Sequence, residues 1–234
     1  MSTTFKYINH ACFMLSHEGH NIIFDPYLEG CPKFKPYDTE ASGNTEALKK
    51  LNVEYILVSH AHFDHIGSAF DIAKACDATI ISTAEVAGLA GENGCKAHGM
   101  HLGGTHKFDF GHVRIVPAFH GSGVAGGHAC GFIVDFYGTK LYFAGDTALF
   151  GDMQLLQRLD PFDYAVLPIG DNFTMGPADA AIAAEFLKAK YVIPVHYNTW
   201  PLIAQDPEAY KAKVEADGSA KVLVVPVGES IELE

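Results

Sequence analysis

One six-residue stretch, His60-Ala61-His62-Phe63-Asp64-His65, constrains this chain more than any other part of its sequence. It follows an apolar, β-branched run from Tyr55 to Ser59 that is typical of a buried strand. It precedes Ile66 to Ala75, where apolar residues recur with helical spacing and predict a helix. Three imidazoles and one carboxylate are therefore expected on the turn between a core strand and a helix.

The spacing within this stretch suits metal binding. In an extended turn, residues two apart point the same way, so His60 and His62 can hold one cation together. Asp64 and His65 point elsewhere and are candidates for a second cation. Neutral imidazole and carboxylate groups suit zinc, and equally manganese or iron. The alternative, four polar residues in a solvated loop, is the weaker interpretation.

Three later β-rich runs each lead into one further candidate ligand. Val113 to Phe119 leads into His120, Leu141 to Gly145 into Asp146, and Tyr191 to Val195 into His196. Together with the six-residue stretch, these positions resemble the metallo-β-lactamase superfamily, which has a His-x-His-x-Asp-His signature, then a third His, a bridging Asp and a final His. The resemblance implies an α/β fold, the four-layer αββα sandwich, with residues 1–234 as a single domain.

The residues of three short segments narrow the group of proteins that the chain resembles. Three segments, 144–147, 167–175 and 193–199, are similar to a group of compact, predicted metal-dependent hydrolases. That group is related to the bacterial ascorbate-6-phosphate lactonases and, more distantly, to phospholipase D-type N-acylethanolamine enzymes. The similarity covers nearly the full chain. The similarity indicates metal-dependent hydrolysis, but it does not identify the substrate.

The resemblance also implies a ligand set for two divalent ions, with zinc expected first and manganese or iron as alternatives. One ion is assigned to His60, His62 and His120, the other to Asp64, His65 and His196, and Asp146 bridges them. Two such ions about 3.5–4 Å apart can bind a water and lower its pKa to about 7, which provides hydroxide at neutral pH. Asp64 is a catalytic candidate because it could orient that hydroxide, while His10 or a water is the candidate acid for the leaving group.

Two residues near the N-terminus are open to two interpretations each. His10 lies between two predicted strands, Phe5 to Ala11 and Cys12 to Ser16, and is either a turn histidine or part of the site. Asp25 ends a third strand before Pro26. It is either a turn residue or a hydrogen-bond acceptor for a metal-binding imidazole, since bound imidazoles usually donate their other N–H to such a group.

Other segments give weaker expectations. Tyr27 to Asn44 has no periodicity and is predicted to be a long loop, and the glycine-rich Gly121 to Gly127 is interpreted as a substrate-facing loop with a plain turn as the alternative. A hairpin is predicted across Tyr137-Gly138. Two β-then-α stretches are expected, about 5–97 and 107–233, and the second would include strands at 222–226 and 231–233. Four further histidines are given no role: His98, His101, His106 and His112.

Composition restricts the function classes. The net charge of −12 argues against nonspecific nucleic-acid binding, which depends on basic contacts to phosphate. No run approaches the roughly 18 apolar residues of a membrane span, and the start of the chain lacks an apolar segment of signal-peptide length. Five scattered cysteines without a Cys-x-x-Cys motif favour reduced thiols. The expectation is a cytoplasmic protein that binds neither membrane nor nucleic acid, with homo-oligomerisation left open.

The sequence therefore predicts a metal-dependent hydrolase that cleaves an ester, lactone or phosphodiester bond in a small, polar, anionic substrate. No Gly-x-Ser-x-Gly motif competes with this interpretation. Two alternatives stay open: a metal-binding sensor or binding module without turnover, and a nuclease-type phosphodiesterase.

Overall fold

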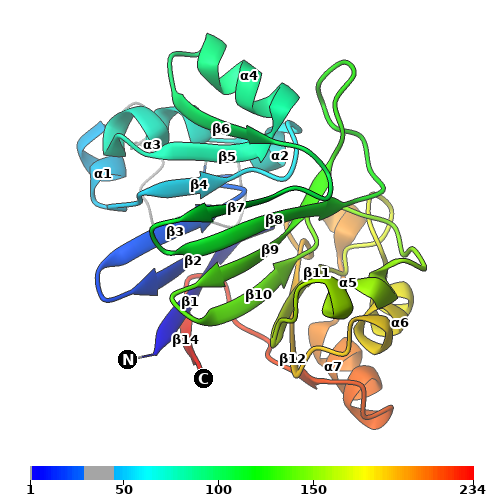
Figure 1. Ribbon diagram of the computed structural model, residues 1–234. Helices are drawn as coiled ribbons and strands as arrows, with labels where there is room; N and C mark the ends of the chain where they lie inside the picture. Colours follow the sequence, from blue (N-terminus) through cyan, green and yellow to red (C-terminus); the bar gives the residue numbers. More distant parts are fainter. Residues whose placement is uncertain (1, 29–44) are drawn as a thin grey trace. The chain divides into compact units, whose positions relative to one another are not determined.

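A computed structural model describes residues 2–28 and 45–234. Of the loop predicted from Tyr27 to Asn44, residues 29–44 lie outside the described residues. The chain separates into two compact units (Figure 1). Unit 1 comprises residues 1–102, 121–129 and 226–234, and unit 2 comprises residues 103–120 and 130–225. The single domain predicted from the sequence stays a prediction.

Unit 1 is built on a mixed sheet in the order β14-β1-β2-β3-β4-β5-β6. Its strands are β1 (Thr3–Asn9), β2 (Cys12–His17), β3 (His20–Phe24), β4 (Tyr55–Leu57), β5 (Thr79–Thr83), β6 (Lys96–Met100) and β14 (Ser230–Leu233). Strands β3 to β6 run parallel, so their carboxyl ends lie at one edge. Residues that follow these strands, Asp25 and His60 among them, are therefore brought to the same edge.

The helices of unit 1 are α1 (Thr45–Lys49), α2 (Phe63–Ile66), α3 (Ala69–Cys76) and α4 (Ala84–Glu92). The helix predicted from Ile66 to Ala75 is confirmed from Ala69 onward as α3, but Ile66 ends α2, because Gly67 separates the two helices with a φ of +34°. A β-carbon at Gly67 would lie 2.6 Å from the carbonyl oxygen of Pro26. The helix breaks because the backbone must pass this close to the segment after β3.

Unit 2 is built on a second mixed sheet, in the order β13-β12-β11-β10-β9-β8-β7. Its strands are β7 (Thr105–Phe108), β8 (Gly111–Pro117), β9 (Cys130–Phe136), β10 (Thr139–Phe143), β11 (Tyr164–Pro168), β12 (Tyr191–Val195) and β13 (Lys221–Val222). The predicted hairpin between β9 and β10 is confirmed, with Tyr137 and Gly138 both at positive φ. Strands β10 to β13 are parallel, and β8 runs in the same direction because it is antiparallel to β9.

Unit 2 carries the helices α5 (Met153–Leu159), α6 (Pro177–Leu187) and α7 (Pro207–Ala216) and the 3₁₀ turn η2 (Pro201–Ile203). Their apolar faces supply Leu156, Ala184 and Tyr210 to a buried core that includes Ala165 and Val192 of the sheet. Helix α6 begins at Pro177, which suits a proline because the first helical position needs no hydrogen-bonded N–H.

Two assignments of the chain to the sheets differ from expectation. Strand β14 pairs antiparallel with β1, so residues 231–233 belong to unit 1 and not to the second β-then-α stretch. The strand expected over 222–226 is only Lys221–Val222, since the chain then leaves the sheet of unit 2 for unit 1. Short strands carry little information about which strand they pair with. Within the described residues, no helix has the length and apolar character needed to cross a membrane.

Candidate metal centre

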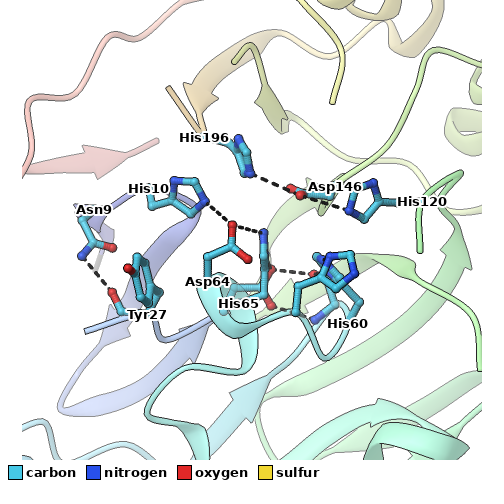
Figure 2. A network of polar contacts seen from close by, with 12 residues as sticks. Asn9, His10, Tyr27, His60, Asp64, His65, His120, Asp146 and His196 are labelled. Atoms are coloured by element: carbon cyan, nitrogen blue, oxygen red, sulfur yellow. Dashed lines mark hydrogen bonds and ion pairs between the residues drawn. The ribbon is translucent and has the colours of Figure 1, made fainter. Parts of the chain in front are cut away.

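The six-residue signature lies where β4 passes into α2, at the carboxyl edge of the parallel strands of unit 1 (Figure 2). His60 and His65 are fully buried, while His62 and Asp64 are partly exposed. Burying imidazoles without hydrogen-bond partners is unfavourable, so the partners of these rings decide what the rings can do.

Asp25 provides those partners. Its Oδ1 accepts a hydrogen bond from the backbone N–H of Ser59 at 2.7 Å, and its Oδ2 accepts one from the Ser59 hydroxyl at 2.6 Å. The same Oδ2 lies 2.7 Å from Nδ1 of His65. The interpretation of Asp25 as the acceptor for a candidate ligand is therefore confirmed, and its carboxylate is completely buried.

These bonds fix which nitrogen of each ring carries a proton. An ionised carboxylate only accepts, so His65 donates from Nδ1 and presents an Nε2 lone pair. The Ser59 hydroxyl has one hydrogen, which it gives to Asp25, so it accepts from Nδ1 of His60 at 2.9 Å. His60 then also presents its Nε2 as an acceptor. Both buried rings are set in the form that binds a metal ion.

His60 and His62 converge as the two-residue spacing predicted. Nε2 of His60 lies 2.9 Å from Nδ1 of His62. Two ring nitrogens this close can share a proton or bind one cation together.

His10 lies in this cluster, beside a candidate ligand, and its role in the site stays a prediction. Its Nε2 lies 3.1 Å from Oδ2 of Asp64, and its ring is buried. The Tyr7 hydroxyl donates to the carbonyl of His10 at 2.7 Å and holds the turn in place. Asp64, His65 and His10 each offer one ligand atom within 4.8 Å of the others. His10 lies in a left-handed turn with a φ of +48°, which brings its ring to Asp64. Hydrophobic patterns in a sequence do not predict such a turn.

Unit 2 brings the three later candidates together. Nε2 of His196 lies 3.2 Å and Nε2 of His120 lies 3.5 Å from Oδ2 of Asp146, so this carboxylate oxygen lies between the two rings (Figure 2). Asp146 and His196 are buried. Asp146 follows β10, His196 follows β12 and His120 follows β8. These three strands end at the same edge of the sheet. The sequence prediction that each follows a strand is confirmed.

Hydrogen bonds join the loops that carry these residues. The hydroxyl of Thr147 accepts from the backbone N–H of Phe119 at 3.0 Å, and its carbonyl accepts from Met175 at 3.0 Å. Gly170 packs so closely on His196 that a β-carbon would lie 2.2 Å from its carbonyl oxygen. Burial, with a smaller effect from Glu208, raises the pKa of Tyr197 to about 12, so the phenol beside His196 stays protonated at neutral pH.

The glycine-rich segment after His120 belongs to unit 1 and packs on the signature itself. The carbonyl of Ser122 accepts a hydrogen bond from Ala61 at 2.7 Å. A β-carbon on Gly123 would lie 2.7 Å from the carbonyl carbon of Ala61 and 2.9 Å from the nitrogen of His62. The absence of side chains therefore lets this segment support the backbone at His62. The interpretation of this segment as a substrate-facing loop stays a prediction.

Alanine at Gly123 should loosen the signature in a way that alanine at Gly126 does not. Both residues have similar φ, +73° and +77°, so both variants carry the same left-handed strain, but a β-carbon at Gly126 meets nothing within 4 Å. We expect Gly123→Ala to bind metal roughly 10-fold more weakly, because His62 must shift. Titration of the metal-free proteins against a competing chelator measures this. Equal affinities in the two variants would contradict a supporting role for Gly123.

The donor set of both units fits divalent metal ions. Within the described residues it consists of neutral imidazoles and carboxylates, the groups that zinc, manganese and iron share. The tautomers set by Asp25 leave ring nitrogens available as ligands. His112, to which no role was assigned, instead pairs with Asp160 at 2.7 Å.

Comparisons with known proteins agree with the geometry. A family profile described as a β-lactamase superfamily domain matches residues 20–197. A UPF0173 metal-dependent hydrolase of Natranaerobius thermophilus is 49% identical over 228 residues, 97% of this chain and 98% of the relative. Igni18, a metallo hydrolase from the archaeon Ignicoccus hospitalis, is similar in structure with a TM-score of 0.89 and 33% identity, covering 100% of this chain and 99% of the other.

A more distant solved structure, the metallo-β-lactamase fold protein YhfI of Bacillus subtilis, has a TM-score of 0.75 at 10% identity, with all of both chains covered. It supports the fold alone, and with Igni18 it confirms the predicted αββα class. The sequence identity, the profile match and the histidine and aspartate clusters lead to one conclusion: the chain is a metal-dependent hydrolase and belongs to the metallo-β-lactamase superfamily, among the UPF0173 hydrolases.

Proposed function

We propose that this hydrolase cleaves an ester, lactone or phosphodiester bond in a small anionic substrate with the help of two divalent ions. In this proposal His60, His62 and His120 hold one ion, Asp64, His65 and His196 hold the other, and Asp146 bridges them. The order of these residues along the chain supports the assignment, as does the convergence of ligand atoms inside each unit. Zinc is the first candidate, with manganese or iron as alternatives.

The observation that carries the proposal is the set of bonds made by Asp25. A buried carboxylate that fixes the tautomers of two buried imidazoles, one directly and one through Ser59, has a clear use if both Nε2 atoms bind a cation. A purely structural cluster would not need both rings to carry their proton on Nδ1.

When bound, two such ions supply a water that is nucleophilic at neutral pH and polarise the bond to be cleaved. The residues of the chain then have separate tasks. Asp64 orients the attacking water through its carboxylate. His10 donates from Nε2 to Oδ2 of Asp64, and His10 or a water is the candidate acid for the leaving group.

The test joins metal analysis to a substrate screen. We expect about two ions per chain after reconstitution with zinc or manganese, and hydrolysis of a lactone, a small carboxyl ester or a generic phosphodiester that vanishes with chelator. Trace occupancy of both sites would overturn the proposal. A metal-loaded protein that cleaves none of these would favour the sensor alternative, and efficient cleavage of long RNA alone would favour the nuclease.

A further inference from the structure

Three large apolar side chains are exposed on loops of unit 2 that follow β8, β11 and β12, and the first and last of these loops also carry a proposed ligand. Phe119, Phe173 and Leu202 are 62%, 51% and 62% exposed. Phe119 immediately precedes His120, Phe173 lies in the loop after β11, and Leu202 lies six residues after His196. We call these three residues the apolar rim.

The apolar rim is one connected structure and not three separate surface residues. Phe119 donates its N–H to the hydroxyl of Thr147, whose carbonyl accepts from Met175, two residues beyond Phe173. The segment with Leu202 is joined to the loop after β11 because the Gln205 amide donates to the carbonyl of Gly170 at 3.1 Å. The loops that position His120, Asp146 and His196 therefore also position the rim.

The same arrangement recurs in unit 1. Phe63 lies between His62 and Asp64 within the signature and is 68% exposed, although its ring meets the buried Tyr27 edge-on at a centroid distance of 5.9 Å. The signature and the segments that carry His120 and His196 thus each combine proposed ligands with an apolar side chain left in solvent. An exposed apolar group gains free energy when a ligand covers it.

We infer that the substrate is amphipathic: an acyl chain or aromatic ring, attached to the bond that is cleaved, packs on the apolar rim. The inference rests on the proposed function and narrows its substrate class. Two connections carry it: Phe119 directly precedes His120, and the loop that holds Phe173 is hydrogen-bonded through Met175 to Thr147, the residue after Asp146. A purely polar substrate would leave these rings uncovered.

Hydroxamates provide a test that does not depend on the bond cleaved, because they bind divalent metal ions directly. Acetohydroxamate and octanohydroxamate share the binding group and differ only in chain length. Each buried methylene contributes roughly a fourfold gain in affinity, so burial of two or three predicts binding of octanohydroxamate about 15- to 60-fold tighter to the metal-loaded protein. Calorimetry measures both affinities.

The double variant Phe119→Ala with Phe173→Ala should reduce that preference to about threefold or less and leave acetohydroxamate binding and metal content unchanged. Its matched control is Leu155→Ala with Leu159→Ala, two leucines that are 44% and 53% exposed on the helix α5 and are not part of the apolar rim. The control should keep the full preference. If the double variant fails to fold, Phe173→Ala alone should lower the preference.

The outcomes separate the two proposals. If neither hydroxamate binds and the protein retains no metal, the proposed function has failed. Acetohydroxamate binding with no gain from the longer chain overturns the amphipathic substrate alone. A change of oligomeric state in the double variant, seen by sedimentation, would show that a second copy of the chain covers the rim, and would also overturn it.

Discussion

Asp146→Ala is expected to reduce kcat/KM at least about 100-fold and to lower the number of bound ions. Its Oδ2 lies within 3.5 Å of Nε2 of both His120 and His196, so alanine removes the group that holds these two rings around one point. Two cations brought together without this negative charge repel each other. Kinetics on the substrate found by screening and metal analysis of the same preparation measure both effects.

Two further variants serve as comparisons for Asp146→Ala. Asp160→Ala removes another carboxylate of unit 2 that pairs with a histidine, His112, but that belongs to no proposed ligand set, and it should keep activity within a few-fold. His10→Ala should lose less than Asp146→Ala, since His10 donates to Asp64 and holds no ion in the proposal. If His10→Ala abolished turnover while Asp146→Ala retained it, the assigned roles would be wrong.

Asp25→Ala is expected to lower the free energy of unfolding of the metal-free protein by about 3–5 kcal/mol. The change leaves the Ser59 N–H, the Ser59 hydroxyl and Nδ1 of His65 without their acceptor in a fully buried place. It also puts alanine at a φ of +39°, which aspartate and asparagine tolerate better. Urea unfolding of the metal-free variant and of the unmodified chain gives the difference.

Asp25→Asn separates folding from metal binding. Asparagine keeps the positive φ, and its carbonyl oxygen can still accept from the Ser59 N–H. Its NH₂ group now meets Nδ1 of His65 and donates to it, which moves the proton of that ring to Nε2. We expect stability within about 2 kcal/mol of the unmodified chain but metal affinity at least about 10-fold weaker. Unchanged affinity in a chelator titration would show that Asp25 does not set the form of His65.

The sequence predicted where the candidate ligands lie relative to the strands, because each position depends on local pattern. A β-rich run and the polar residue that follows it are visible within ten residues, and the edge of a sheet brings such residues together. This holds for His60 after β4, Asp146 after β10 and His196 after β12. The place of Asp25 at the end of a predicted strand made its role as a hydrogen-bond acceptor interpretable for the same reason.

Features that depend on distant backbone could not be predicted in this way. Periodicity continues across Gly67, and only the approach of Pro26 shows why the helix must break there. His10 meets Asp64 across 54 positions of sequence through a left-handed turn. The joining of residues 121–129 to unit 1 depends on glycines whose neighbours lie far away in the chain. Local propensity contains no information about these contacts.

The pairing of β1 with β14 has a consequence for synthesis of the protein. On the ribosome β1 emerges early, but the strand that covers its outer edge is translated only after all of unit 2. Until then the nascent sheet has an uncovered edge, which can recruit strands of other chains. The contact that completes the sheet spans nearly the whole sequence, so its loop-closure entropy is large and folding is expected to be slow. Molecular chaperones that shield such an edge during translation would act on this protein through β1.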